Sequence, residues 1–137
     1  MTDAPLLLIE AAFSVGRVRA KRILCFGEML LRLSAPDKEP LLRSSTLNAA
    51  FGGTEANVAV SLSHFGLAAR VVTVLPENDL GDACLGELRR YGVDTSAVRR
   101  GVGRMGLYFL TPGAMLRPPR LFYDRAGSVF AQTDPGI

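Results

Sequence analysis

The residues best suited to hold a small anion lie near the end of the chain. Arg125 follows Tyr123 by two residues, so both side chains share one face of an extended segment. An arginine fork binds a carboxylate through two parallel charge-assisted hydrogen bonds, which fix its position and its plane. Tyr108, in an earlier extended run, can place a phenol beside them. The group is compatible with a carboxylate site. Strand tyrosines are common packing residues and a strand-end arginine is usually solvated, so from these residues alone a cluster that binds no ligand is the stronger alternative.

A second candidate group surrounds the glycine pair Gly52-Gly53. Missing side chains let a ligand approach the backbone, and amides at the start of the following helix are donors. Asn57 lies one turn into that helix and offers a donor and an acceptor to a pair of hydroxyls. Glu28 comes just past the first predicted strand, at the edge where open parallel sheets bind ligands. The alternatives are a plain tight turn at the glycines and a structural carboxylate at Glu28.

The histidine and cysteine content argues against a metal site, a disulfide framework and a serine-type catalytic triad. The only histidine, His64, leaves no histidine pair for a metal and weakens any catalytic triad. Cys25 and Cys84 are too far apart for a CxxC clip and lie in apolar stretches, so we expect two buried free thiols. Residues 101–106 (GVGRMG) satisfy the pattern GxGxxG, which needs a strand before it and a helix after it. An arginine pair precedes these residues and an extended run follows, so we expect neither a dinucleotide site nor a metal site.

The composition is that of an ordinary globular protein. The 137 residues fit one modest domain, with 48% hydrophobic and 21% charged residues. The net charge is only +3 and the basic residues are scattered, which argues against a nucleic-acid partner. The apolar run at 6–9 is too short for a membrane span and makes a poor secretory signal. We therefore expect residues 1–21 to be an extension outside the fold, residues 22–137 to form the domain, no membrane association and a cytoplasmic location.

The elements that must position these residues read as alternating strands and helices. The expected order is a strand at 22–26, partial alternation at 29–34, a turn at 35–38, mixed extended structure at 41–51, a helix at 55–65, a strand at 70–75 and a helix at 79–91. Gly66 and Gly92 end the two helices, and Asp79 is the expected cap of the second. This order favours a parallel sheet with crossover helices. The runs at 105–110 and 120–123 predict a hairpin with a long tip.

Several segments resemble one protein family. They are residues 23–28 (ILCFGE), 52–59 (GGTEANVA), 72–82 (VTVLPENDLGD), 92–95 (GVDT), 104–110 (RMGLYFL) and 122–128 (FYDRAGS). In this order and spacing they resemble the ribokinase-like, or PfkB, carbohydrate kinases. The last two segments are similar to the 2-keto-3-deoxygluconate kinases of that family.

The resemblance implies an α/β ribokinase-like fold, in which a parallel sheet with crossover helices carries a small β-flap as a lid and the chain ends before the nucleotide-binding half. It implies substrate-binding roles for Glu28, Gly52, Gly53, Asn57, Tyr108, Tyr123 and Arg125. The family's second signature, a glycine-alanine-glycine-aspartate helix start that carries the catalytic base and the anion hole, is absent from this sequence. We therefore expect no catalytic residue here. The complete enzyme would phosphorylate a sugar acid with ATP and Mg²⁺, and this chain alone would bind neither cofactor.

Other functions stay open at this point. One is a kinase of the same family for a neutral sugar. Another is a truncated, non-catalytic remnant that binds sugar or forms a homodimer through the exposed edges of the flap; the resemblance also implies dimers of this kind. A Rossmann-type oxidoreductase ranks lowest, because the glycine motif is misplaced for it.

Overall fold

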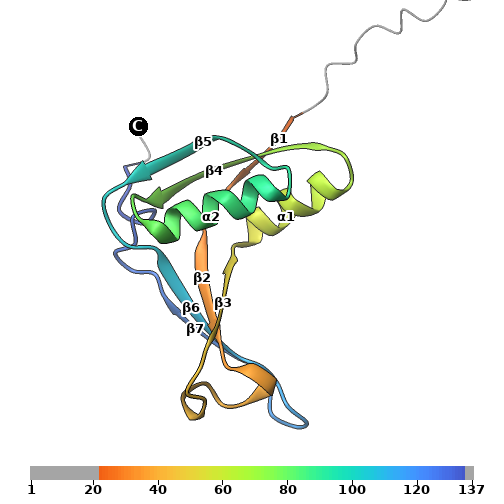
Figure 1. Ribbon diagram of the computed structural model, residues 1–137, viewed down its shortest axis with the longest axis vertical. Helices are drawn as coiled ribbons and strands as arrows, with labels where there is room; N and C mark the ends of the chain where they lie inside the picture. Colours follow the sequence, from red (N-terminus) through yellow and green to blue (C-terminus); the bar gives the residue numbers. More distant parts are fainter. Residues whose placement is uncertain (1–21, 135–137) are drawn as a thin grey trace, which may run out of the picture.

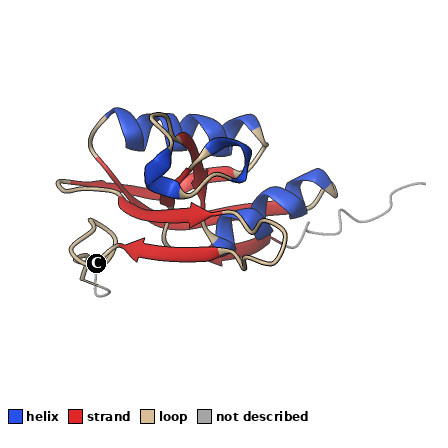
Figure 2. Cartoon of the chain, turned by 90° about the horizontal axis from the view of Figure 1, so that it is seen from below, coloured by secondary structure: helices blue, strands red, loops and turns tan. Residues whose placement is uncertain are grey.

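The computed structural model describes residues 22–134, so the predicted extension at 1–21 lies outside the described residues. The elements are β1 (Arg22–Phe26), β2 (Leu30–Ser34), η1 (Pro36–Lys38), η2 (Leu41–Arg43), β3 (Asn48–Gly52), α1 (Thr54–His64), β4 (Ala68–Pro76), α2 (Asp79–Arg90), β5 (Asp94–Gly101), β6 (Gly106–Thr111) and β7 (Arg120–Asp124). Figure 1 shows a layer of sheet and helices from which a narrow second sheet projects. Figure 2 distinguishes the helices from the strands in a view from below.

The first sheet is parallel and has the order β1-β4-β5. Its central strand, β4, alternates between side chains buried under the helices and half-buried ones, as the period of two requires. The sequence analysis correctly predicted β1, β4 and the crossover helices. It did not predict β5, whose residues are largely polar or basic. Pairing with β4 makes this segment a strand, because its backbone groups complete the ladder there.

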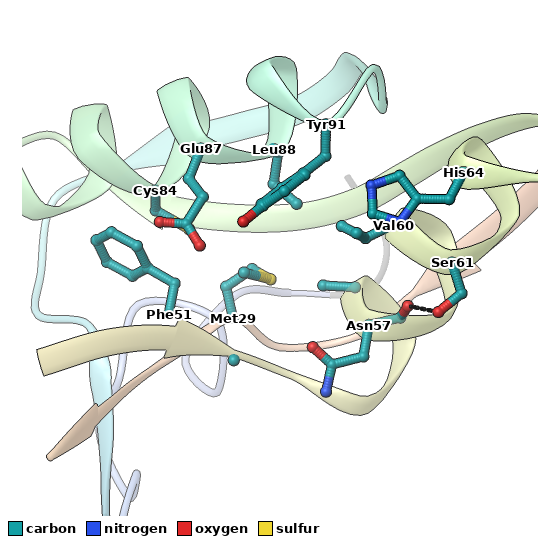
Figure 3. Close-up of a pocket in the computed structure, with 12 residues that line it drawn as sticks. Met29, Phe51, Asn57, Val60, Ser61, His64, Cys84, Glu87, Leu88 and Tyr91 are labelled. Carbon is teal, nitrogen blue, oxygen red and sulfur yellow. Dashed lines mark hydrogen bonds between the residues drawn. The ribbon is translucent and has the colours of Figure 1, made fainter. Parts of the chain in front are cut away.

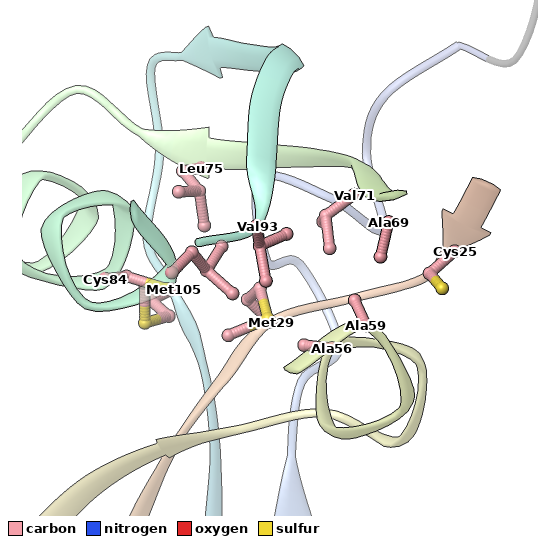
Figure 4. Close-up of a cluster of buried hydrophobic side chains, with 11 residues drawn as sticks. Cys25, Met29, Ala56, Ala59, Ala69, Val71, Leu75, Cys84, Val93 and Met105 are labelled. Atoms are coloured by element: carbon pink, nitrogen blue, oxygen red, sulfur yellow. The ribbon is translucent and has the colours of Figure 1, made fainter. Parts of the chain in front are cut away.

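The hydrophobic core lies between this sheet and the two helices (Figure 4). Its buried members are Cys25, Met29, Ala56, Ala59, Ala69, Val71, Leu75, Cys84, Leu88, Val93 and Met105. The small residues Ala56 and Ala59 let α1 approach the sheet closely, and both cysteines are buried free thiols as predicted. On the opposite face of the sheet, Leu24 and Phe26 are 63% and 68% exposed. Phe130 covers part of that face, with its ring centroid 5.6 Å from that of Phe26.

The helix ends follow local chemistry. Gly66 adopts φ +75° after α1, and the amide of Leu67 bonds to the carbonyl of Leu62 at 3.0 Å, which closes the last turn. Gly92 ends α2 in the same way, with φ +77°. The cap of α2 differs from the prediction. The Asn78 side chain, one residue before Asp79, accepts a hydrogen bond from the Gly81 amide at 3.1 Å, and Asp79 is the first helical residue.

The second sheet, which we call the flap, has the order β3-β2-β6-β7. Strands β6 and β7 form the predicted antiparallel hairpin, and β2 joins β6 in parallel. The mixed segment at 41–51 becomes the short helix η2 followed by the edge strand β3. Near the tip, Arg117 donates to the carbonyl of Lys38 at 2.7 Å and to that of Pro112 at 3.2 Å, which ties the segment after β2 to the loop between β6 and β7.

The fold also decides whether the glycine pattern at 101–106 is a dinucleotide-binding motif. The argument against a dinucleotide site was partly wrong, because β5 does run up to Gly101 and supplies the preceding strand. The segment that follows is strand β6, not a helix. Since the motif places the pyrophosphate on a helix N-terminus, the absence of that helix in this segment is enough to set the dinucleotide interpretation aside.

Candidate functional site

A cleft of about 880 Å³ separates the flap from the carboxyl end of β1 and the start of α1. Its lining residues are Phe26, Gly27, Glu28, Leu30, Gly53, Thr54, Glu55, Asn57, Tyr108, Leu110, Leu121, Tyr123, Arg125 and Phe130. Six of the seven residues predicted from the sequence to bind substrate are among them. The seventh, Gly52, faces a neighbouring cavity.

Two tyrosines form the flap wall of the cleft. Tyr108 on β6 pairs directly with Tyr123 on β7. Their ring centroids are 5.7 Å apart and the rings are inclined by 28°, in a stacked arrangement. The Arg125 guanidinium carbon lies 5.9 Å from the centre of the Tyr123 ring, within cation–π range. The hairpin therefore brings the predicted arginine and both tyrosines together in one place.

Arg125 remains accessible, whereas Glu28 does not. The Arg125 side chain is 59% exposed and the Glu28 side chain only 8%. The shortest distance between their charged groups, Nη1 to Oε2, is 3.7 Å, which is a loose ion pair. Glu28 instead accepts a hydrogen bond of 2.5 Å from the hydroxyl of buried Ser128. These contacts favour the alternative of a structural carboxylate at Glu28 and leave the guanidinium of Arg125 open toward the cleft.

Gly106 allows Glu28 and Arg125 to come together. A Cβ on Gly106 would lie 2.7 Å from Oε1 of Glu28, 3.0 Å from Cβ of Arg125 and 2.6 Å from Leu30. All three distances are too short for a side chain at this position. The glycine that opens β6 is thus the point at which the flap closes onto the end of β1.

Arg104 holds the turn that carries Arg125. It donates to the carboxylate of Asp124 at 2.8 Å, to the carbonyl of Asp124 at 3.2 Å and to the carbonyl of Ala126 at 2.6 Å. Gly127, with φ +71°, completes the turn. Sequence reasoning placed Arg104 in a motif but did not assign it a role. An arginine and an aspartate separated by 20 residues carry no local signal of pairing.

The glycine pair makes close contacts within the protein itself. A Cβ on Gly52 would lie 2.8 Å from the Tyr108 hydroxyl, and one on Gly53 would lie 2.6 Å from the carbonyl oxygen of Glu28. Gly53 is therefore required by the backbone that follows β1, whatever binds beside it, whereas a side chain at Gly52 would have to displace the Tyr108 hydroxyl. Asn57 is exposed and lines both the cleft and the neighbouring cavity. Its backbone amide donates to Gly53 at 2.9 Å.

The neighbouring cavity, of about 380 Å³, lies between α1 and α2 (Figure 3). His64 at the end of α1 meets the ring of Tyr91 edge-on, with centroids 5.7 Å apart, which is a packing contact. Cys84 lies at the α2 wall. Burial, reinforced by the negative charge of Glu87, raises the pKa of the Cys84 thiol to about 12. A thiol with such a pKa is protonated at neutral pH and is a poor nucleophile.

Within residues 22–134, no three histidine, cysteine, aspartate or glutamate side chains converge to hold a metal ion. Neither described helix, α1 or α2, has the length and hydropathy of a transmembrane span.

Comparison with known proteins identifies the family. The sequence pattern of the pfkB family of carbohydrate kinases matches residues 20–117. The chain belongs to the pfkB family of carbohydrate kinases. It is 34% identical over 113 residues to the 2-dehydro-3-deoxygalactonokinase of Haloferax volcanii, with 82% of this chain and 36% of that protein covered. Among solved structures, the 2-dehydro-3-deoxygluconokinase of Thermotoga maritima aligns with a TM-score of 0.80 and 45% identity, over 82% of this chain and 35% of that one.

A second solved structure contains a nucleotide. The fructokinase of Xylella fastidiosa with bound ATP aligns with a TM-score of 0.69 and 28% identity, over 83% of this pfkB-family chain and 33% of the fructokinase. The chain thus spans about a third of the length of the relatives that it matches.

Proposed function

We propose that this chain is the sugar-acid recognition part of a pfkB-family kinase, and that the substrate is 2-keto-3-deoxygluconate. The observation that carries the proposal is the exposed guanidinium of Arg125 beside the stacked pair Tyr108 and Tyr123. This substrate has one carboxylate, one ketone and several hydroxyls. The guanidinium suits the carboxylate through a two-pronged charge-assisted pair. The phenols suit the oxygens next to it, and the ring faces suit its carbon chain.

Arg125 is available for such a ligand. Its nearest carboxylate, on Glu28, is 3.7 Å away and already accepts a shorter bond from Ser128. An incoming carboxylate therefore competes with one loose contact only. Because the pair with Glu28 also keeps the guanidinium near the cleft, part of the conformational cost of ordering this side chain is met before the ligand arrives.

Phosphoryl transfer itself is not assigned to these residues. By family relation, the complete kinase would use ATP and Mg²⁺ to phosphorylate a primary hydroxyl of the sugar acid. The described residues do not converge on a metal site. In this proposal the chain binds and orients the acceptor. Because the glycine-alanine-glycine-aspartate signature is absent from its sequence, we expect it to have little or no kinase activity alone.

The test is a titration of the 137-residue chain with 2-keto-3-deoxygluconate, followed by calorimetry or NMR shifts. Arg125→Ala should weaken binding about ten- to hundredfold, as expected for hydrogen bonds between charged groups. Arg120→Ala is the matched control, because Arg120 is exposed at the start of β7, the strand that ends just before Arg125, but does not line the cleft. It should leave the affinity unchanged. If both variants bind as tightly as the wild type, the carboxylate assignment is wrong. If a neutral sugar such as fructose binds more tightly than the acid, the substrate class is wrong.

A further inference from the structure

Glu55 is a carboxylate of the cleft to which the sequence motifs assign no role. It lies in the first turn of α1, is half-buried and lines the cleft beside Gly27 and Thr54. Its side chain has no hydrogen-bond or ion-pair partner within residues 22–134. A half-buried carboxylate without a partner is unfavourable. The residue therefore has capacity to accept hydrogen bonds from something that enters the cleft.

The position of this carboxylate is set by Gly27. A Cβ on Gly27 would collide with Cγ, Cδ and Oε2 of Glu55, so the side chain lies directly on the backbone that follows β1. The charge of Glu55 also acts on the nearby thiol of Cys25. Burial raises the pKa of this thiol, and the Glu55 carboxylate raises it further. The carboxylate is thus packed in one place at the end of β1.

Three charged residues line the cleft. Glu28 is nearly buried beside Arg125 and bonded to Ser128, which leaves Arg125 and Glu55 as the more accessible pair of opposite charges. Arg125 lies on the flap side, at the end of β7, and Glu55 lies on the side of α1. A carboxylate accepts hydrogen bonds and does not donate them, so it attracts hydroxyls and repels another anion. Such a cleft suits a molecule that is anionic at one end and hydroxylated at the other, and it disfavours the reversed orientation.

We propose that Glu55 is a specificity-determining residue that accepts hydrogen bonds from the hydroxyls of the sugar acid while Arg125 holds its carboxylate. This inference rests on the proposed function, since it assumes that a sugar acid is the ligand. A simpler role also exists. An acidic residue in the first turn stabilises a helix through its dipole whether or not a ligand binds, and the experiment has to separate the two roles.

The experiment uses two ligands and one matched control variant. The ligands are 2-keto-3-deoxygluconate and 2-oxobutanoate, a keto acid without hydroxyls. The control is Asp79→Asn, because Asp79 is the corresponding acidic residue in the first turn of α2 and does not line the cleft. NMR titrations of the 137-residue chain give both affinities for the wild type, for Glu55→Gln and for the control.

We expect Glu55→Gln to weaken 2-keto-3-deoxygluconate binding about tenfold or more, the usual size for hydrogen bonds to a charged acceptor. The affinity for 2-oxobutanoate should stay the same or rise. Asp79→Asn should change neither affinity. The decisive quantity is the affinity for 2-keto-3-deoxygluconate divided by the affinity for 2-oxobutanoate. Both ligands bind the same folded fraction of the protein, so a partial loss of folding cancels in this ratio.

The outcomes separate this inference from the proposed function. If the wild type binds no sugar acid, the proposed function fails and the inference fails with it. If the wild type binds the sugar acid and Glu55→Gln leaves the affinity ratio unchanged, only the role of Glu55 is refuted. If Glu55→Gln melts at a much lower temperature than the control, the two affinities are measured instead for Glu55→Asp, and their ratio is compared with that of the wild type. That ratio falls if Glu55 binds the hydroxyls and is unchanged if its role is structural.

Discussion

Replacing Ser128 by alanine should destabilise the protein strongly, although it removes a single oxygen atom. Ser128 is fully buried. Its hydroxyl donates to Oε1 of Glu28 at 2.5 Å and accepts from the amide of Ala131 at 3.2 Å. The Glu28 side chain is 8% exposed, so water cannot readily take the place of the lost donor. The variant leaves a nearly buried carboxylate with only the loose contact to Arg125.

The magnitude follows from the two lost hydrogen bonds. Leaving a buried charged acceptor without its donor costs about 1.5–3 kcal/mol, and the neutral bond to the Ala131 amide adds about 1 kcal/mol. We therefore expect the free energy of unfolding to fall by about 2–4 kcal/mol. In a domain of this size each kcal/mol shifts the melting temperature by about 3–5 °C, so the midpoint should drop by about 10 °C.

Urea unfolding followed by circular dichroism measures this change, and Ser61→Ala is the control. The Ser61 hydroxyl is exposed and donates to the carbonyl of Asn57 at 2.9 Å within α1. Its removal should change stability by less than about 0.5 kcal/mol. In a Glu28→Gln background the cost of Ser128→Ala should shrink, since no buried charge is left without a donor. Equal stabilities of Ser128→Ala and Ser61→Ala would refute the reasoning.

Two further predictions concern ion pairs. Arg104→Ala removes the donors that hold Asp124 and Ala126 in the turn before and after Arg125. It should therefore weaken sugar-acid binding through Arg125, and Arg104→Lys should restore part of the affinity. Unchanged affinities in titrations with 2-keto-3-deoxygluconate would contradict this positioning role. Hydrogen bonds from Ser96, together with Arg70, lower the pKa of Asp94 well below its usual range. A lowered pKa stabilises the fold above the unfolded value, about 3.9. Asp94→Asn should therefore be less stable than the wild type at pH 7, and the difference should begin to shrink as the pH falls below about 4 and be lost only as the pH approaches the lowered pKa of the folded state; a difference that is constant from pH 7 to pH 3 would be evidence against it.

The two helices, the hairpin and the central strand could be predicted because each depends on nearby residues. Glycines that adopt a left-handed conformation mark both helix ends, and the alternation in β4 reflects one buried face. The register of Tyr108 opposite Tyr123 follows once β6 and β7 form a hairpin. For the same reason the sequence brought these tyrosines and Arg125 together as a candidate site, whose role in binding stays a prediction.

The errors came from segments with ambiguous local chemistry. Residues 94–101 carry polar and basic side chains and become β5 through pairing with β4 at the edge of the sheet. Asn78 and Asp79 are both good capping residues in adjacent positions. The backbone is extended at Asn78 and helical from Asp79 onward, so the Asn78 side chain caps the helix. The residue types alone do not show at which of the two positions the backbone changes.

By itself, the sequence determined β1, β4, both helices, the hairpin and the family, and it predicted the residues that would hold an anion. Only the tertiary structure decided how those residues are used. Ser128 and Glu28 are 100 positions apart, yet their contact holds the Glu28 carboxylate in a nearly buried position, while Arg125 stays accessible. The sequence equally could not show the close approach of Gly52 to Tyr108, or that the Glu55 carboxylate lines the cleft with no partner among residues 22–134. Local patterns report on neighbours within a turn or a strand, whereas burial and charge partners depend on which distant segments the fold brings together.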